Sequence, residues 1–299
     1  MNTKRKHLSP AQATEWAQMA HALYLEALMA QARWSVGDIA FHGGTSLRLS
    51  WSSSRYSEDL DFLLSRGVGN LDKVSRKVAQ AIGEMARRVD SRFVITVSDK
   101  SKNADRMASF LLSVSHRDYI GTAKIKAEFW RTDPAYLERY PTQLRTPQTR
   151  AAVLDFQALV THPVPAATLE TAYADKLVAF ATRPYLKWRD LYDLWWIGTQ
   201  TTTRLDMPTL CRQFLHNLGA YNTLQGLPPA EALALFLSHD RQALVAQADP
   251  DLKTWLPEAL WKQLQSDGVR QMVDYVFQAI GEVCTHLRQG KPAPGNVNA

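Results

Sequence analysis

Cysteine is scarce in this sequence, and long apolar runs are missing. The chain of 299 residues has only two cysteines, Cys211 and Cys284, too few for a disulfide framework and without the paired spacing of a metal site. We expect both to be buried thiols in a reducing cytoplasm. The basic N-terminus is followed by a stretch that Glu15, Gln18 and Glu26 interrupt. The sequence therefore predicts neither a signal peptide nor a transmembrane helix.

Internal repeats are also missing, and the excess of charge is modest. Lysine and arginine number 35 against 29 acidic residues, which gives a net charge of +6. Hydrophobic residues make up 45% of the chain and charged residues 21%, as in a soluble globular protein with a buried core. The basic excess favours a polyanionic partner without identifying one, because the basic residues are spread along the chain.

The most informative stretch is residues 41–64, FHGGTSLRLSWSSSRYSEDLDFLL. Asp59 and Asp61 lie two positions apart and alternate with Leu60 and Phe62. On a strand, residues i and i+2 point to the same face, about 6.5–7 Å apart, so the carboxylates would lie side by side while Leu60 and Phe62 face the core. Two anions held so close repel each other unless a cation lies between them. Mg²⁺ suits this place because it prefers carboxylate, water and phosphate oxygens.

A glycine pair precedes the two aspartates. Gly43 and Gly44 follow the apolar residues 39–41, which predicts a tight turn after a strand. Thr45 would begin a helix whose free N–H groups face an anion. Further donors for a triphosphate follow in the chain: Arg48, Arg55 and Ser57. Each feature alone is weak evidence for a site, but their order predicts a strand, a phosphate-binding turn, a helix, a loop and a metal-binding strand.

Periodicity predicts the elements around this stretch. Ser9 and Pro10 form a helix start signal. The expected helices of the first half cover residues 11–33 and 70–89. The expected strands cover residues 92–97, 110–115, 119–130 and 152–156, with a hairpin turn at 116–118.

Almost every segment beyond Pro165 has helical character. The expected helices cover residues 167–182, 187–200, 207–219, 229–247 and 257–289. We place a domain boundary near Pro165, with a first domain of residues 1–165 and a helical domain of residues 166–289. The last ten residues, 290–299, are expected to be a disordered tail.

A third carboxylate lies on the last strand of the predicted hairpin. Lys124, Lys126 and Glu128 share one face of this strand, and apolar residues occupy the other. A third carboxylate on a strand beside the aspartate strand would complete a three-acid, two-metal cluster. The residues alone leave a second reading open, in which Glu128 is a salt-bridge partner of the lysines on an exposed face.

A second informative stretch covers residues 171–197. Lys176 lies on one predicted helix, which ends at Arg183 and Pro184, and Asp190 and Asp193 lie on the next. Positions i and i+3 are neighbours on a helix. From physical chemistry alone, this stretch is either a helical pair laced by surface ion pairs or part of a site.

Both stretches resemble the AbiEii/AbiGii toxin family of type IV toxin–antitoxin and phage-defence systems, within the polymerase-beta-like nucleotidyltransferase superfamily. The residues that carry the resemblance are Gly43, Gly44, Thr45, Leu47, Arg48, Arg55, Ser57, Asp59, Asp61, Phe62, Lys176, Ala179, Arg189, Asp190, Tyr192, Asp193 and Leu194. The likeness covers roughly residues 41–197, and the C-terminal third matches only in being helical. One departure is Pro184 after Arg183, which affects the turn between the helices.

The resemblance implies an α+β fold: a polymerase-beta-like nucleotidyltransferase domain with a mixed sheet, followed by a C-terminal helical bundle. It implies transfer of a nucleoside monophosphate from an NTP, with the 3′ end of tRNA as the acceptor. Asp59, Asp61 and Glu128 would bind Mg²⁺ or Mn²⁺, and Asp59, Asp61, Lys176 and Asp190 would be catalytic. The implied nucleotide-binding residues are Gly43, Gly44, Thr45, Arg48, Arg55, Ser57, Lys176 and Asp193. A winged-helix DNA-binding antitoxin is the expected partner, and no membrane is expected.

Other classes of function stay open at this point. The same site could modify a protein or a small molecule, or act as a phosphotransferase, and the chain could also be a silent member of a toxin–antitoxin pair. If the acceptor is RNA, two groups of basic residues are candidates for binding it. They are Lys73, Arg76, Lys77, Arg87 and Arg88 on the second helix, and Lys124 and Lys126 on the strand.

Overall fold

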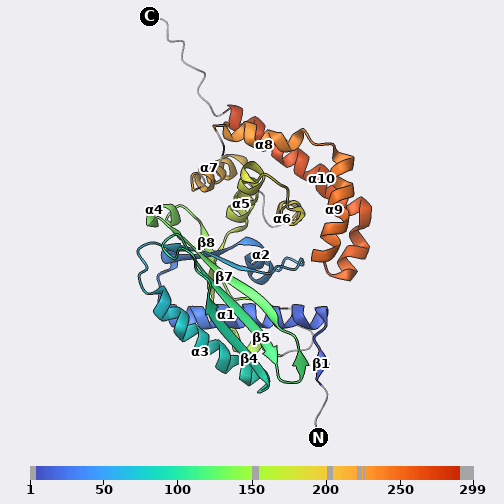
Figure 1. The fold of residues 1–299 in the computed structure, drawn as a ribbon. Coiled ribbons are helices and arrows are strands. Elements are labelled where there is room, and N and C mark those ends of the chain that lie inside the picture. The colour runs from blue at the N-terminus through green and yellow to red at the C-terminus, as the bar shows by residue number, and fades with distance from the viewer. Residues whose placement is uncertain (1–4, 150–154, 201–204, 221–223, 225, 290–299) are drawn as a thin grey trace, which may run out of the picture. The chain divides into compact units, whose positions relative to one another are not determined.

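The computed structural model describes residues 5–149, 155–200, 205–220, 224 and 226–289. These residues form two compact units (Figure 1). The first unit comprises the described residues up to Ser53 together with Ser57–Ala167, and the second comprises Ser54–Tyr56 together with the described residues from Thr168 onward. The predicted tail, residues 290–299, lies outside the described residues.

A seven-stranded mixed sheet forms the first unit. Its strands, in spatial order, are β4 (Phe93–Asp99), β5 (Met107–His116), β7 (Ala123–Thr132), β3 (Leu60–Ser65), β2 (Ile39–His42), β9 (Val164–Ala167) and β8 (Thr142–Arg145). The pairs β3–β7 and β2–β9 are parallel, and the other neighbours are antiparallel. The predicted α+β class, with a mixed sheet followed by helices, is confirmed.

Two long helices pack side by side and cover one face of this sheet: α1 (Pro10–Ala32) and α3 (Leu71–Val89) (Figure 1). As predicted, α1 begins at Ser9. The Ser9 hydroxyl accepts a hydrogen bond from the Gln12 backbone N–H, and the Gln12 side chain accepts one from the Ser9 N–H. This reciprocal cap satisfies two of the donors that a helix start leaves unpaired. Shorter helices are η1 (Val36–Asp38), α2 (Gly43–Trp51), α4 (Pro134–Leu137) and η2 (Gln157–Leu159).

The core of the first unit lies between α1, α3 and this one face. As predicted, Leu60 and Phe62 are fully buried there. The Phe62 ring stacks between Phe41 on β2, at 5.2 Å between centroids, and Phe129 on β7, at 4.7 Å. Because strand residues alternate between faces, the residues between these aromatic side chains, including Asp61, point to the opposite face.

Two details of the strand predictions were wrong. The expected strand over 119–130 is interrupted at Gly121, whose φ of +127° is a conformation that favours glycine. Before the interruption, β6 (Tyr119–Ile120) pairs in parallel with β1 (Lys6–His7) rather than with β5. The expected strand over 152–156 lies largely outside the described residues, and its last two, Asp155 and Phe156, are not in a strand. Pro165 lies inside β9.

The second unit is helical (Figure 1). Its helices are α5 (Leu169–Thr182), α6 (Trp188–Gly198), α7 (Met207–Leu218), α8 (Pro229–Leu237), α9 (Arg241–Trp255) and α10 (Glu258–Gln289). None of the helices within the described residues is both long and apolar enough to cross a bilayer. Both cysteines are buried free thiols, as predicted.

Two predicted helices of this unit need correction. The expected single helix over 229–247 is two helices, because Asp240 caps a new helix start by accepting a hydrogen bond from the Ala243 N–H. The last helix is kinked at Gln265, where φ is +39° and ψ is −152°. Helical periodicity alone does not show such breaks, since the apolar pattern continues through them.

The aromatic stack across β2, β3 and β7 predicts a large stability effect. We expect Phe62→Ala to lower the free energy of unfolding of the first unit by about 3–5 kcal/mol, because the cavity would remove contacts on both sides of the ring. Val94→Ala, at an exposed position of β4, should change it by less than about 0.5 kcal/mol. Urea denaturation of both variants measures the difference, and equal effects would contradict this account of the core.

Candidate active site

Carboxylates and polar groups from four adjacent strands lie in one row on the face of the sheet opposite α1 and α3. Asp61 on β3 is opposite His42 on β2 and opposite Glu128 on β7. Glu128 is in turn opposite Ser109 on β5. Asp59 comes directly before β3, two positions from Asp61 and therefore on the same face. The structure thus brings the three predicted metal-binding residues to one region.

The turn after β2 is built around Gly43. This residue has a φ of +77°, which a side chain would strain, and a Cβ there would lie 2.6 Å from Asp61 Oδ2. Glycine therefore lets the turn approach the Asp61 carboxylate directly. The helix α2 begins at Gly43 itself, so its first N–H groups open at the end of the carboxylate row, where they can bind an anion.

Two hydroxyl groups of α2 hold this turn and the aspartate strand together. The buried Thr45 hydroxyl donates to the backbone carbonyl of Asp59, and the Ser46 hydroxyl donates to the carbonyl of Phe41 at 3.1 Å. Thr45 was predicted to bind phosphate. In the structure its hydroxyl fixes the backbone of a carboxylate residue, and its part in phosphate binding stays a prediction.

The carboxylates destabilise each other's charge. Burial raises the pKa of Asp59, and the negative charge of Asp61 raises it further. Burial and Asp61 likewise raise the pKa of Glu128. Lys126 lowers both pKa values by its charge, but it does not outweigh the other effects. This environment favours a bound cation, which would neutralise the repulsion.

The donor set fits Mg²⁺ or Mn²⁺. All three side chains offer the hard oxygen ligands that these ions prefer, and the glycine at position 43 leaves the Asp61 carboxylate accessible from the turn. In the described parts of the chain, no three His, Cys, Asp or Glu side chains are grouped so that together they could hold a metal ion. Mg²⁺ does not require one, because it is commonly held by one or two carboxylates together with water and substrate phosphates.

Sequence analysis did not identify His21, which supports this region from α1. The imidazole is 1% exposed, and its Nε2–H donates to the Glu58 backbone carbonyl at 2.8 Å. Burial lowers the pKa of His21 to about 4; the Glu58 hydrogen bond opposes this shift, and the charge of Arg48 adds to it. The neutral imidazole thus anchors the residue immediately before Asp59. Its signal was weak in sequence, since a lone histidine on a helix is most often a core residue.

The other predicted site residues form a separate group in the second unit. Arg55 makes a bidentate ion pair with Asp193, with Nε–Oδ1 at 2.5 Å and Nη2–Oδ2 at 2.6 Å. Lys176 Nζ lies 2.7 Å from Asp190 Oδ1 and 2.8 Å from Asp193 Oδ2. These are buried contacts, so the alternative of surface ion pairs along a helical pair is wrong.

A third cation joins this network. Arg183 follows the last residue of α5, and its guanidinium donates to Asp190. Burial would raise the pKa of Asp190, but Lys176 and Arg183 outweigh it and hold the pKa at about 2. Burial would lower the pKa of Lys176, but Asp190 and Asp193 outweigh it and raise the pKa. Arg183, the residue before the unusual Pro184, therefore bridges α5 and α6.

Two predicted triphosphate donors remain. Arg48 donates to Gln18 Oε1 on α1 at 3.0 Å, and Ser57 is half-buried in the loop before β3. The assignment of Arg48 and Ser57 to nucleotide binding stays a prediction.

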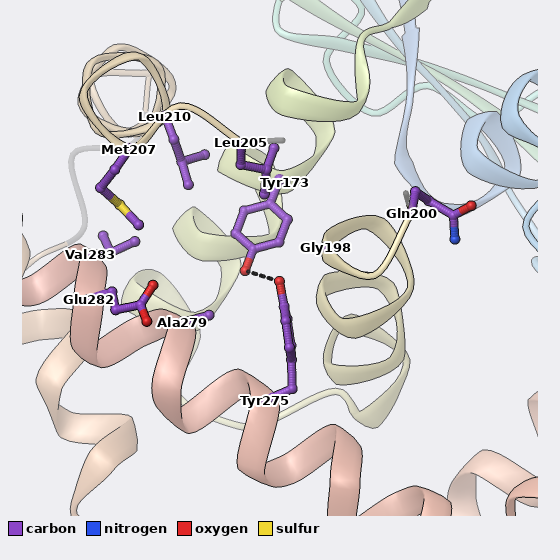
Figure 2. Close-up of a pocket in the computed structure, with 10 residues that line it drawn as sticks. All are labelled: Tyr173, Gly198, Gln200, Leu205, Met207, Leu210, Tyr275, Ala279, Glu282 and Val283. Carbon is purple, nitrogen blue, oxygen red and sulfur yellow. Dashed lines mark hydrogen bonds between the residues drawn. The ribbon is translucent and has the colours of Figure 1, made fainter. Parts of the chain in front are cut away.

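The second unit also contains a cavity of about 360 Å³ between α5, α6, α7 and α10 (Figure 2). The hydroxyls of Tyr173 and Tyr275, two of the residues that line it, form a hydrogen bond of 3.4 Å. Tyr275 packs against Gly198, where a Cβ would lie 1.6 Å from its hydroxyl. Among the described residues that line the cavity, none was predicted to be part of the site.

Comparison with known proteins places these observations in a family context. Residues 30–282 match the sequence model of a family described as nucleotidyl transferase AbiEii toxin, type IV TA system. The match extends well beyond residues 41–197, so the expected limit of the resemblance was too narrow. No curated protein matches the chain significantly.

Two crystal structures share the fold. A candidate nucleotidyltransferase from Helicobacter pylori is 16% identical, with a TM-score of 0.54, over 96% of this chain and all of that protein. JHP933 from Helicobacter pylori is 17% identical, with a TM-score of 0.53, over 94% of this chain and 97% of that protein.

The buried His21 predicts an acid-sensitive stability. The unfolded chain binds a proton at this residue below a pH of about 6.5, whereas the folded chain binds it only near pH 4. Stability is therefore complete above pH 6.5 and falls by about 3 kcal/mol as the pH falls towards 4. Urea titrations across this range should show a smaller loss of stability for His21→Gln, whose side chain can still donate to the Glu58 carbonyl. An equal loss of stability in both proteins would show that His21 is not its cause.

The network around Asp193 predicts a destabilising substitution. Asp193→Asn would leave Arg55 and Lys176 buried with one carboxylate fewer, and we expect the free energy of unfolding to fall by about 3–5 kcal/mol. Asp274→Asn is the matched control, because Asp274 pairs with Arg241 at the surface and should contribute at most about 1 kcal/mol. A similarly small effect of both variants in urea denaturation would contradict the structural role of the network.

Proposed function

Because the chain belongs to the AbiEii family of nucleotidyltransferase toxins of type IV toxin–antitoxin systems, we propose that it transfers a nucleoside monophosphate from an NTP to the 3′ end of tRNA. Such a modification would block translation. One observation carries this proposal: the alignment of Asp61 with Glu128 across β3 and β7, beside the Gly43 turn. The transfer chemistry needs these two features next to each other, namely a cation site and an anion-binding helix start.

Each part of the row has a role in this reaction. The Asp59, Asp61 and Glu128 carboxylates would hold Mg²⁺ or Mn²⁺. When bound, the ion would supply Lewis-acid stabilisation of the phosphate oxygens. The first N–H groups of α2 would bind the phosphates at Gly43 and Gly44. One carboxylate would accept the proton of the attacking hydroxyl, while the bond from oxygen to the α-phosphorus forms and the bond to the leaving pyrophosphate breaks.

We expect Lys176 and Asp190, in the network of the second unit, to act in catalysis, and Lys176 and Asp193 to act in nucleotide binding. Three cations, Lys176, Arg55 and Arg183, face two carboxylates, Asp190 and Asp193. Among these cations, Lys176 is the one that we expect to contact a nucleotide phosphate, as a charge-assisted contact. We expect Lys176→Ala to weaken NTP binding by about 1.5–3 kcal/mol, as the loss of a charge-assisted contact does.

Partners follow from the same proposal. A type IV system includes an antitoxin, and we propose a small winged-helix DNA-binding protein encoded next to this chain, acting in the cytoplasm. A protein or small-molecule acceptor is the alternative. The cheapest discriminating observation is the neighbouring gene.

A transfer assay tests the proposal. The purified chain, Mg²⁺ and each α-³²P-labelled NTP are incubated with total RNA, with a protein extract or with an aminoglycoside, and we expect label on tRNA only. Asp61→Asn should reduce transfer by at least about 100-fold and leave the thermal unfolding curve in place. Glu84→Gln, an exposed carboxylate of α3, is the control and should be fully active. Label on the protein or the aminoglycoside would replace the proposed acceptor, and an active Asp61→Asn would remove the proposed site.

A further inference from the structure

Trp130 is an exposed aromatic side chain close to the proposed catalytic row. It is 39% exposed and follows Glu128 by two positions on β7, so both side chains lie on the face of the sheet opposite α1 and α3, about 6.5–7 Å apart along the strand. The packing of β7 on the core is provided by the alternate residues, including the fully buried Phe129. The indole therefore lies outside the core that α1 and α3 cover.

One cation lies beside this indole, and two more follow further along the same face of the strand. The Arg106 guanidinium lies 5.9 Å from the centre of the Trp130 ring. Lys124 and Lys126 are exposed on the same face of β7. From Lys124 to Trp130 this strand face spans about 20 Å, and it presents two lysines, a carboxylate and an aromatic ring in that order.

Arg106 is held in place by the backbone around it. Its N–H donates to the Asn103 carbonyl at 3.1 Å, and its own carbonyl accepts from the Arg131 N–H at 2.9 Å. This second bond ties the turn before β5 to the residue that follows Trp130. The guanidinium and the indole are therefore neighbours because of the strand pairing.

Trp130 and the phosphate-binding turn lie on different strands, and this separation assigns the RNA acceptor and the NTP to different sides of the carboxylate row. The phosphate-binding turn at Gly43 follows β2, whereas Trp130 lies on β7, two strands further along the sheet order. Strands are about 4.8 Å apart, so roughly 10 Å separate the strand of the turn from that of the indole. Glu128 lies on the indole side of Asp61. The acceptor hydroxyl would therefore approach from the β7 side, and the NTP phosphates from the β2 side.

We propose that Trp130, with Arg106 beside it, is a stacking platform for the terminal bases of a single-stranded RNA acceptor. This inference rests on the proposed RNA acceptor and adds the surface that binds it. Every base offers a flat face to an aromatic ring, and lysine and arginine complement the phosphates. An apolar protein segment would leave the cations without partners, and a protein contact of the indole is an outcome of the sedimentation measurement below.

The basic residues of α3 are a matched contrast. Lys73, Arg76 and Lys77 are exposed, but α3 packs on the face of the sheet opposite the carboxylate row. Their charges therefore lie on the side away from Trp130. A nonspecific charge effect should depend on them, whereas the proposed platform should not.

A binding experiment tests the platform directly. The probe is a short single-stranded RNA with the sequence of a tRNA acceptor end, labelled with fluorescein at its 5′ end, and anisotropy gives its Kd. We expect Trp130→Ala to raise this Kd roughly 5- to 150-fold, as the loss of one base–aromatic stack does. Trp130→Tyr should retain most of the affinity, while Trp130→Leu should not. Val94→Ala should stay within about 3-fold of the parent, and the triple variant Lys73→Glu, Arg76→Glu, Lys77→Glu should lower the affinity less than Trp130→Ala does.

Kinetics separate the platform from the proposed function. In the transfer assay, Trp130→Ala should raise KM for RNA and leave KM for the NTP unchanged. A parent that labels RNA, together with a Trp130→Ala variant that has an unchanged RNA Kd, would overturn the platform and leave the function intact. Full recovery by Trp130→Leu would also overturn it, because apolar area would then suffice. The platform would also be overturned if sedimentation showed a lower mass as the only change in Trp130→Ala. The indole would then contact another protein chain rather than RNA. A parent that labels no RNA would instead overturn the proposed acceptor, and the platform with it.

Discussion

The register between β2, β3 and β7 is the constraint on which the rest of the first unit depends. Strand residues alternate between faces, so the stacked rings of Phe41, Phe62 and Phe129 on the core side fix which residues face outward. A slip by one residue would bury Asp61 among aromatic rings and expose Phe62. The cost of burying an unpaired carboxylate, together with the loss of the aromatic contacts, makes such a slip strongly unfavourable. The core thereby positions the carboxylates without touching them.

Much of this arrangement was predictable because it is local. The alternation of Asp59 and Asp61 with Leu60 and Phe62 fixes their faces within one strand, and the glycine pair fixes a turn within two residues. The pairing of Glu128 with Asp61 is not local, since 67 positions separate them; only the superfamily resemblance suggested it, and the register supplies it. The break at Gly121 and the helix start at Asp240 were missed because the apolar period continues across both.

In the second unit, the sequence motif was recognised, but the burial of its charged residues was not. Lys176, Asp190 and Asp193 could be singled out from sequence, but spacing along two helices does not reveal that all three are buried together. That depends on Arg55, which is remote in sequence, belongs to the loop before β3 and groups with the second unit. Arg55 lies only four residues before Asp59. The segment leading into β3 therefore carries one of the charges that the buried network requires.

Net charge says little about where an anionic substrate binds, and the faces of the sheet say more. Exposed basic residues occur both on α3 and on β7, and composition treats them alike. The sheet separates them, because α3 covers the face that holds the core and β7 presents its lysines, Glu128 and Trp130 on the other. A polyanion attracted to α3 would still have to reach around the edge strand β4 to meet the carboxylates. One held on β7 is already beside them, so the proton-accepting group and the acceptor surface can belong to the same strand.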